Sequence, residues 1–367
     1  MNYMRIIFKK FKARMIVGCI LAVIALLAVS VIVFINQASF GRTPRGERLE
    51  RVMKSPNYRN GEFKNQHETL LMTSDRGRFS GIWEFIFRKI DGLRPEQAVK
   101  AIKTDLRKIG RNEEILVWFG HSSYLIQTGG KRILVDPVFC MASPVSFVNK
   151  PFKGTELYTP DDMPDIDYLV ISHDHWDHLD YNTVKKLKDR IGAVICPLGV
   201  GEHFEYWGFD KERLIELDWN EDANLAPGFM IHCLPARHFS GRRLTANQSL
   251  WASFLLEAPS QKIYIGGDGG YDTHYAEIGN RFPGIDLAIL ENGQYNEEWS
   301  LIHLMPQYMA QTARDLKAKR VLTVHHSKYA LVKHRWDEPL KNAEEMKNKD
   351  SLNVLIPEIG EVVALEK

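Results

Sequence analysis

The chain has 367 residues, of which 44% are hydrophobic and 26% are charged, and such values are ordinary for a globular protein. The length allows one large domain or two smaller ones. The formal net charge of only +2 gives no case for nucleic acid as a partner, and the basic residues near the N-terminus lack the interleaved aromatic residues that stack on bases.

The N-terminal end combines positive charge with an uncharged apolar run. Residues 15–35 carry no charge, and at 1.5 Å per residue they would span about 30 Å as a helix, which matches the hydrocarbon core of a bilayer. Five basic residues precede this run without an acid among them: Arg5, Lys9, Lys10, Lys12 and Arg14. The pattern predicts a basic cytoplasmic end over 1–14, a single transmembrane helix over 15–36, and a catalytic part outside the cytoplasm.

A cleaved signal peptide is the alternative for this segment. Its apolar core normally has about 7–15 residues and is followed by a small-residue cleavage site. Here the run is longer, and residues 36–39 (Asn-Gln-Ala-Ser) make a poor site. The sequence therefore favours an uncleaved anchor.

The cysteines argue weakly against an oxidising exterior. Cys19 lies in the apolar run, and Cys140, Cys196 and Cys233 are scattered without a Cys-x-x-Cys pair. Their apolar neighbours predict buried, unpaired thiols.

Residues 37–110 precede the predicted catalytic domain. Residues 41–81 are polar and rich in Asn, Gly and Arg, which is typical of a linker or a wrapping segment. Residues 82–90 place apolar side chains at helical spacing and are either a helix packed on the domain or an amphipathic segment at the membrane interface. Residues 95–109 carry a second helical pattern, with Pro95 suited to a first turn.

The predicted catalytic domain covers residues 111–367 and begins with short apolar strands. The runs 115–119, 123–126 and 133–135 are separated by the turns at Gly120 and Gly129. His121 and Asp136 follow two of these strands, where each either supports a functional site or caps a turn.

Residues 168–180 form the stretch around which the chain is organised. The apolar residues 168–171 predict a buried strand, and residues 173–178 then read His-Asp-His-Trp-Asp-His. Imidazole nitrogens and carboxylate oxygens suit zinc. A tight turn after the strand would direct His173 and His175 at one ion, and Asp177 and His178 toward a neighbouring ion.

Three later strands also end in metal-ligand residue types. The run 229–235 leads to His238, the run 262–265 leads to Asp268 within a glycine-rich turn, and the run 320–324 leads to His325 and His326. This recurrence predicts one shared edge of a sheet where these side chains meet. The glycines around Asp268 let the backbone bend and leave room for an ion.

The motif 173–178 resembles that of the metallo-β-lactamase superfamily, and the likeness runs from about residue 118 to the C-terminus. A closer resemblance, to the N-acylphosphatidylethanolamine-hydrolysing phospholipase D branch, rests on residues 171–182, 197–199, 216–219, 267–271 and 277–279. The resemblance implies an α/β sandwich of αββα layers with two zinc ions at one edge. It implies His173, His175 and His238 as ligands of one zinc, Asp177, His178 and His325 as ligands of the second, and Asp268 as the bridge. Of the neighbouring pair 325–326, His325 is chosen because it directly ends the strand.

The resemblance also implies the chemistry: a membrane-anchored dinuclear zinc phosphodiesterase that cuts a glycerophospholipid through a metal-bound hydroxide. Asp177, Asp268 and His303 would be the catalytic residues, with His303 facing the substrate; as a lone histidine, His303 is equally well interpreted as a packed surface residue. The sequence contains no G-x-S-x-G serine-hydrolase motif and no P-loop. A lactone or carboxylic-ester hydrolase, and a metal-binding membrane protein without turnover, are the alternative functions.

Overall fold

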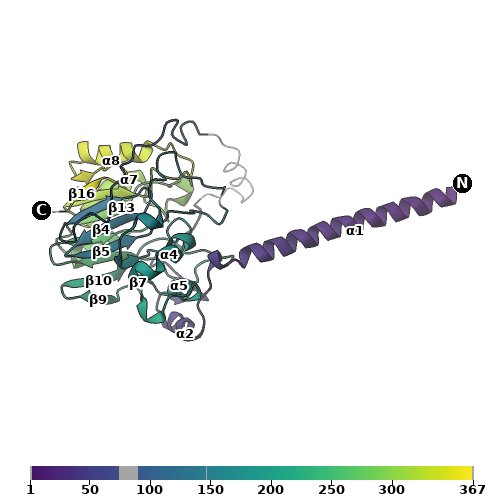
Figure 1. Cartoon of the computed structure of the whole chain (residues 1–367), viewed down its shortest axis with the longest axis horizontal. Coiled ribbons are helices and arrows are strands. Elements are labelled where there is room, and N and C mark those ends of the chain that lie inside the picture. Colours follow the sequence, from purple (N-terminus) through teal and green to yellow (C-terminus); the bar gives the residue numbers. More distant parts are fainter. Residues whose placement is uncertain (1, 74–89, 146, 366–367) are drawn as a thin grey trace.

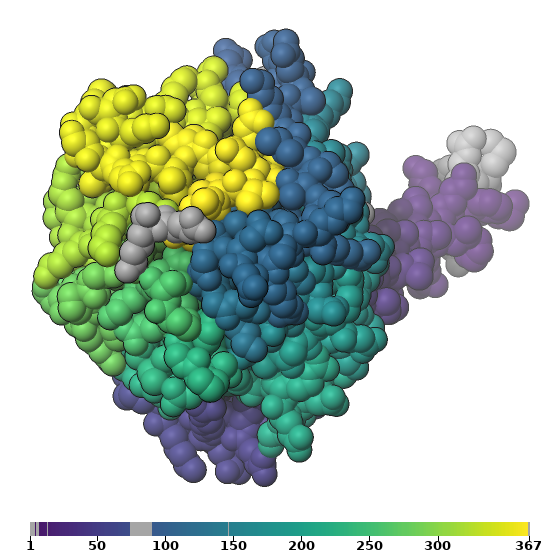
Figure 2. Space-filling view, turned by 60° about the vertical axis from the view of Figure 1, so that its left-hand side comes forward, coloured from purple at the N-terminus to yellow at the C-terminus, as the bar shows by residue number. Residues whose placement is uncertain are grey.

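The computed structural model describes residues 2–73, 90–145 and 147–365 (Figure 1). Its first helix, α1 (Asn2–Ile35), projects away from the body of the molecule, as Figures 1 and 2 both show. Among the described residues it is the one helix with a segment, Ile7–Ile35, that is long and apolar enough to cross a membrane. A signal sequence passes the same test of length and composition. The test therefore makes α1 a candidate membrane span and nothing more specific.

Two seven-stranded sheets form the body. The first sheet has the strand order β16-β3-β4-β5-β6-β7-β8, and the second has the order β15-β14-β13-β12-β11-β10-β9. The first comprises β3 (Ile115–Trp118), β4 (Tyr124–Thr128), β5 (Lys131–Val135), β6 (Ile166–Val170), β7 (Ile191–Pro197), β8 (Leu214–Leu217) and β16 (Val362–Ala364). The second comprises β9 (Asp222–Ala226), β10 (Phe229–Leu234), β11 (Ser253–Glu257), β12 (Lys262–Ile265), β13 (Leu287–Glu291), β14 (Arg320–Val324) and β15 (Val354–Leu355).

Alternation along the strands builds three apolar layers. Leu116 and Trp118 of β3 point into the core between the sheets, where they join Ile263 and Ile265 of β12. Ile115 and Val117, one residue out of phase, face the opposite side of the first sheet. Because both faces of both sheets are apolar, each sheet needs a further layer on its outer face.

Helices supply the outer layers. Helices α4 (Tyr181–Leu187) and α5 (Gly201–Tyr206) bury Val184 and Phe204 on the outside of the first sheet. Helices α6 (His274–Arg281), α7 (Pro306–Asp315) and α8 (Glu338–Asn348) cover the second sheet through Ile278, Met309 and Met346. The predicted αββα layering is thereby confirmed.

The chain between α1 and the sandwich contacts both sheets' sides of the molecule, with α2 on the side of the first sheet and residues 65–69 beside loops that follow strands of the second. This segment contains α2 (Gly46–Lys54) and a small hairpin of β1 (Tyr58–Arg59) and β2 (Glu62–Phe63). Arg48 of α2, 8% exposed at its side chain, lies 2.7 Å from Glu202 and 2.6 Å from Glu216. A buried cation held by two carboxylates ties the segment firmly to α5 and β8.

The helix predicted over residues 95–109 is wrong. The backbone N–H groups there bond to distant partners instead of the preceding turn: Val99 donates to the Lys153 carbonyl and Ile102 to the Ile359 carbonyl. Ala101 forms a β-bridge with Ile359, so the segment runs extended along the domain. The apolar spacing that suggested a helix instead serves to bury Leu106.

The predictions for the amphipathic pattern over 82–90 and for the cysteines have different outcomes. The amphipathic pattern over 82–90 lies outside the described residues, apart from Ile90. Cys196 and Cys233 are buried and unpaired, but Cys140 is exposed, so the prediction of a buried thiol is wrong at that position. Cys140 lies in a loop after β5 rather than in a strand, so no sheet face covers it.

Candidate metal centre

The predicted ligands gather at one edge of the sandwich because each follows a strand that ends there. Residues 173–178 follow β6, His238 follows β10, Asp268 follows β12 and His325 follows β14. Since β5 to β8 run parallel to one another, as do β12 to β15, their carboxyl ends meet at a common edge. The motif itself is a turn, and helix α4 starts only at Tyr181, with Asp180 as its N-cap.

Three histidines form the first half of the site. His173 Nε2 lies 2.9 Å from His175 Nδ1, which lies 3.3 Å from His238 Nε2. Three ring nitrogens that face one another at this spacing are arranged as ligands of a single cation.

The second half combines carboxylate and imidazole groups. His121, Asp177, His178 and His325 each offer one atom within a group that could hold an ion. Asp177 Oδ2 lies 3.0 Å from His121 Nε2 and 3.3 Å from His325 Nε2. His121 therefore belongs to the second half of the site. The sequence alone left open whether it supports the site or caps a turn.

Asp268 lies between the two halves. Its carboxylate oxygens are 3.2 Å from His178 Nε2 and 3.4 Å from His325 Nε2 on one side. On the other side they are 3.8 Å from His238 Nε2 and 4.0 Å from His173 Nε2. The side chain is buried, and neither Asp268 Oδ1 nor His178 Nε2 has a hydrogen-bond partner. Buried polar atoms left unpaired in this way fit a cation between them.

The outward-facing ring nitrogens are fixed by hydrogen bonds. His178 Nδ1 bonds to Asp136 at 2.8 Å, His238 Nδ1 donates to the Ile302 carbonyl at 2.7 Å, and His173 Nδ1 pairs with Ser172 Oγ at 2.9 Å. Each contact holds the ring so that Nε2 points into the cluster, as metal-binding histidines require. Asp136 thus supports the site.

The charges of the site call for a cation. Burial opposes the charged form of His178, but Asp268 and Asp177 outweigh burial and hold the pKa of His178 well above its usual value. Burial is similarly outweighed at His325, where Asp268 and Asp177 raise the pKa to about 10. The two carboxylates thus retain protons on histidines when nothing else neutralises them, and a metal ion would take the place of those protons.

The backbone is unusual where the two sheets meet at this edge. His121, Asp136 and His325 all have positive φ angles, of 53°, 40° and 69°, which non-glycine residues seldom adopt. Backbone hydrogen bonds hold two of these residues in place. The His121 N–H donates to the His326 carbonyl, and the His325 N–H donates to the His121 carbonyl. His326 itself is buried away from the cluster, with its ring on Trp118.

His303 lies at the wall of the site, beside a carboxylate that the sequence analysis missed. Its Nδ1 is 3.1 Å from Glu291 Oε2 and 4.0 Å from Asp268 Oδ2. Glu291 ends β13, is buried, and also lies 3.5 Å from His325 Nδ1. The signal was an acid at the end of an apolar strand, the same pattern that identified Asp268.

Asn65 is a second residue that sequence reasoning missed. Its Nδ2 donates to the His238 carbonyl at 2.8 Å, and its Oδ1 accepts from the His238 N–H at 3.1 Å. The same Oδ1 accepts from Trp251 Nε1 at 3.0 Å. The side-chain amide of Asn65, in the segment before the sandwich, thus fixes the backbone of His238. No local sequence pattern predicts such a contact.

The cluster opens into a pocket of about 280 Å³. Its walls combine His175, Asp177, Asp268, His303 and His325 with one further polar side chain, Gln294, and with apolar side chains, which are Leu71, Met72, Phe239, Trp299, Ile302, Leu331 and Val332. A small molecule can therefore reach the centre, and the part of it that lies away from the polar cluster meets an apolar surface.

Two sheets flanked by helices, with a His/Asp cluster at one edge, define a metallo-β-lactamase-type hydrolase fold. Residues 131–326 match the family model described as "Beta-lactamase superfamily domain", and the chain belongs to this superfamily. It is a metallo-hydrolase whose His/Asp groups are able to bind metal.

Individual proteins refine this placement. The chain is 35% identical over 319 residues to an uncharacterized protein of Mycobacterium tuberculosis, covering 84% of each chain. It is 29% identical over 231 residues to the N-acyl-phosphatidylethanolamine-hydrolyzing phospholipase D 1 of Caenorhabditis elegans, covering 58% of this chain and 64% of that enzyme. The predicted resemblance to this branch is confirmed at the level of similarity.

A solved structure shares the fold. Igni18, a metallo-hydrolase from the archaeon Ignicoccus hospitalis, superimposes with a TM-score of 0.53 at 20% identity, covering 69% of this chain and 98% of its own. The archaeal chain matches almost entirely within this one, so about a third of this chain lies outside the shared fold.

Proposed function

We propose that this protein is a dinuclear zinc phosphodiesterase of phospholipase D type that acts on N-acylphosphatidylethanolamine-like glycerophospholipids. The position of the Asp268 carboxylate carries this proposal, since it lies within 4.0 Å of histidines from both halves of the site. A carboxylate shared by two ligand groups is what a pair of neighbouring cations requires. We assign His173, His175 and His238 to one zinc, Asp177, His178 and His325 to the other, and Asp268 to both.

The donor set fits zinc because the assigned ligands are five imidazole nitrogens and two carboxylates, all of them members of groups that could hold an ion. Bound there, two cations would polarise the phosphoryl group and acidify water. The other steps belong to the chain's own residues. His303, whose Nδ1 is held by Glu291, has Nε2 available for the substrate or for a proton needed by the departing alcohol. The apolar walls exclude bulk water from the reacting group.

The lipid substrate is supported by two observations besides the similarity to the worm enzyme. The pocket walls beyond the polar cluster are apolar apart from Gln294, and two ring contacts link the end of apolar helix α1 to the histidine motif. Phe34 of α1 packs on Phe40, with ring centroids 5.2 Å apart, and Phe40 packs on Trp176 of the motif at 4.9 Å. A membrane around α1 would hold the site near lipid.

Purified full-length protein tests the function. We expect elemental analysis to find about two zinc ions per chain, and N-acylphosphatidylethanolamine in detergent micelles to yield phosphatidic acid. A soluble phosphodiester, a lactone and a carboxylic ester should be assayed beside it. Faster turnover of the lactone or the ester would replace the phosphodiesterase assignment by a lactone or carboxylic-ester hydrolase. A purified protein without bound transition metal would rule out the dinuclear zinc site.

We further propose that α1 is an uncleaved anchor with its N-terminus in the cytoplasm, because its basic residues precede the apolar run. A reporter that works only outside the cytoplasm should be active when fused after residue 50. Activity of a cytoplasm-only reporter at the same position would reverse the orientation. Fusions to a chain in which Lys9, Lys10 and Lys12 are replaced by glutamate provide the control, since the bias should weaken.

A further inference from the structure

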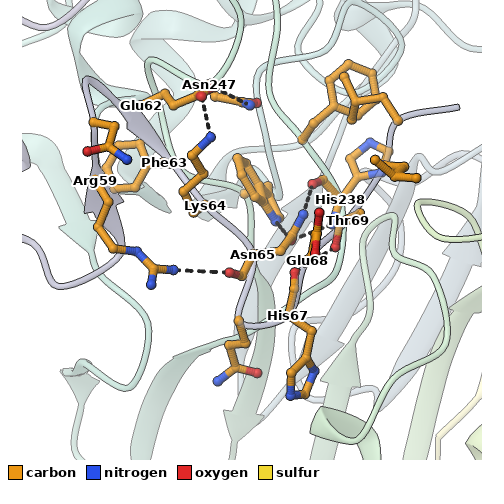
Figure 3. A pocket seen from close by; sticks show the side chains of 16 residues that line it. Arg59, Glu62, Phe63, Lys64, Asn65, His67, Glu68, Thr69, His238 and Asn247 are labelled. Atoms are coloured by element: carbon orange, nitrogen blue, oxygen red, sulfur yellow. Dashed lines mark hydrogen bonds and ion pairs between the residues drawn. The ribbon is translucent and has the colours of Figure 1, made fainter.

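A second cavity, of about 590 Å³, adjoins the metal centre (Figure 3). Residues 59–71 of the segment before the sandwich make one wall, and His238, Phe239, Asn247 and Trp251 make the other. Figure 3 shows Asn65 beside His238, joined to it by the contacts described above. One side of the cavity is therefore fixed rigidly to a residue of the metal centre.

The two cavities share a partition. Leu71 and Phe239 line both, and the Phe239 ring packs on the rings of His175 and His238 with centroids 4.4 and 4.9 Å apart. The pocket at the metal centre, at about 280 Å³, has less than half the volume of the adjoining cavity, at about 590 Å³. The adjoining cavity therefore adds room beside the metal centre for the second arm of a large substrate.

The walls of the second cavity are chemically mixed. Arg59, Lys64, Gln66 and Glu68 bring polar groups, whereas the pocket at the metal centre has only Gln294 as a polar side chain beyond its cluster. Much of the charge is already neutralised within the protein, because Lys64 pairs with Glu62, and His67 lies 2.9 Å from the carboxylate of Asp272. Such a wall suits a polar group of low net charge better than a strongly anionic one.

We infer that the cavity walled by residues 59–71 is the compartment for the departing alcohol of the phosphodiester, an amide- or amine-bearing alcohol of considerable size. The inference rests on the proposed function. In the reaction, the oxygen of water forms a bond to phosphorus, the bond from phosphorus to the alcohol oxygen breaks, and that oxygen takes up a proton. The phosphatidyl arm then lies against the apolar wall, and the alcohol lies on the far side of Leu71 and Phe239.

Filling the cavity tests the inference. Gln66→Trp and Leu70→Trp each place a bulky ring at a residue that lines the cavity and is not a proposed metal ligand, and Leu70 is 56% exposed, so the fold can accept the change. Met53→Trp is the matched control, since Met53 is 57% exposed on α2 and does not line the cavity. The substrates are phosphatidylmethanol, phosphatidylethanolamine and N-acylphosphatidylethanolamine with one common diacylglycerol arm, assayed in detergent micelles with the full chain.

We expect both variants to lose at least tenfold in kcat/KM for N-acylphosphatidylethanolamine while phosphatidylmethanol stays within twofold of wild type. The Met53 variant should match wild type on all three. Equal losses on all three substrates, or no loss on any, would overturn the compartment while leaving the phosphodiesterase intact. A wild-type protein that cleaves none of the three would overturn the proposed function and the compartment with it.

Discussion

Asp268→Ala is expected to lower phosphodiester turnover at least about a thousandfold, which corresponds to about 4 kcal/mol of transition-state stabilisation. The physical reason is the position of this carboxylate, within 4.0 Å of His173, His178, His238 and His325. Its removal takes a ligand from both proposed cations and leaves them facing each other without the negative charge between them. Steady-state kinetics on the fastest phosphodiester, with elemental analysis of the variant, measures the effect.

Asp218→Ala separates this role from the general loss of a buried carboxylate. Asp218 is also buried, but it accepts from Asn57 and from the Trp219 N–H and belongs to none of the groups that could hold an ion among the described residues. We expect Asp218→Ala to lower the melting temperature while keeping zinc and turnover. Wild-type activity of Asp268→Ala would remove Asp268 from the site, and comparable activity losses in both variants would reduce its role to packing.

Removal of metal is expected to lower the melting temperature by roughly 10 °C. A ligand present at about a thousand times its Kd stabilises a fold by about 4 kcal/mol, and each kcal/mol moves the melting temperature of a large domain by about 2–4 °C. Here the metal-free cluster must keep the buried Asp268 close to the partly buried Asp177, with His178 and His325 retaining protons in place of cations. Binding of zinc must displace those protons, so the stabilisation should weaken at acidic pH.

Thermal melts with chelator, followed by addition of zinc, measure this effect. Recovery of the melting temperature with zinc but not with magnesium is the expected result, since nitrogen-rich sites prefer zinc to hard oxygen-seeking cations. The Asp268→Ala variant is the control and should respond less to chelator. Superimposable melting curves with and without chelator would contradict a structural contribution of metal to this edge of the sandwich.

Much of the site was predictable because its signals are local. An apolar strand followed by a histidine or an aspartate can be read directly from the chain at His173, His238, Asp268 and His325. Short apolar strands separated by turns predicted the sandwich for a similar reason, since both signals lie within a few neighbouring residues. The apolar run that became α1 likewise needs no tertiary information, because its length and composition suffice to make it a candidate span.

Other features depend on contacts between distant parts of the chain. Asn65 meets His238 across 173 residues, and Glu291 reaches His303 only because their elements pack together. A polar side chain in a loop looks the same in sequence whether it faces solvent or clamps a ligand. The wrong prediction of a helix over 95–109 has the same origin. The backbone N–H groups of Val99 and Ile102 donate to carbonyls that are distant in sequence instead of to the preceding helical turn.

The sequence by itself thus determined which residue types end the strands, and hence the kind of chemistry at the edge of the sandwich. Only the tertiary structure decided how those ends converge on Asp268, that Glu291 and Asn65 support them, and that residues 59–71 form one wall of a cavity beside the site. The physical reason is the range of the forces involved. Strand periodicity and turn chemistry act between near neighbours in sequence, whereas convergence, clamping and enclosed space arise only when the two sheets close on a common core.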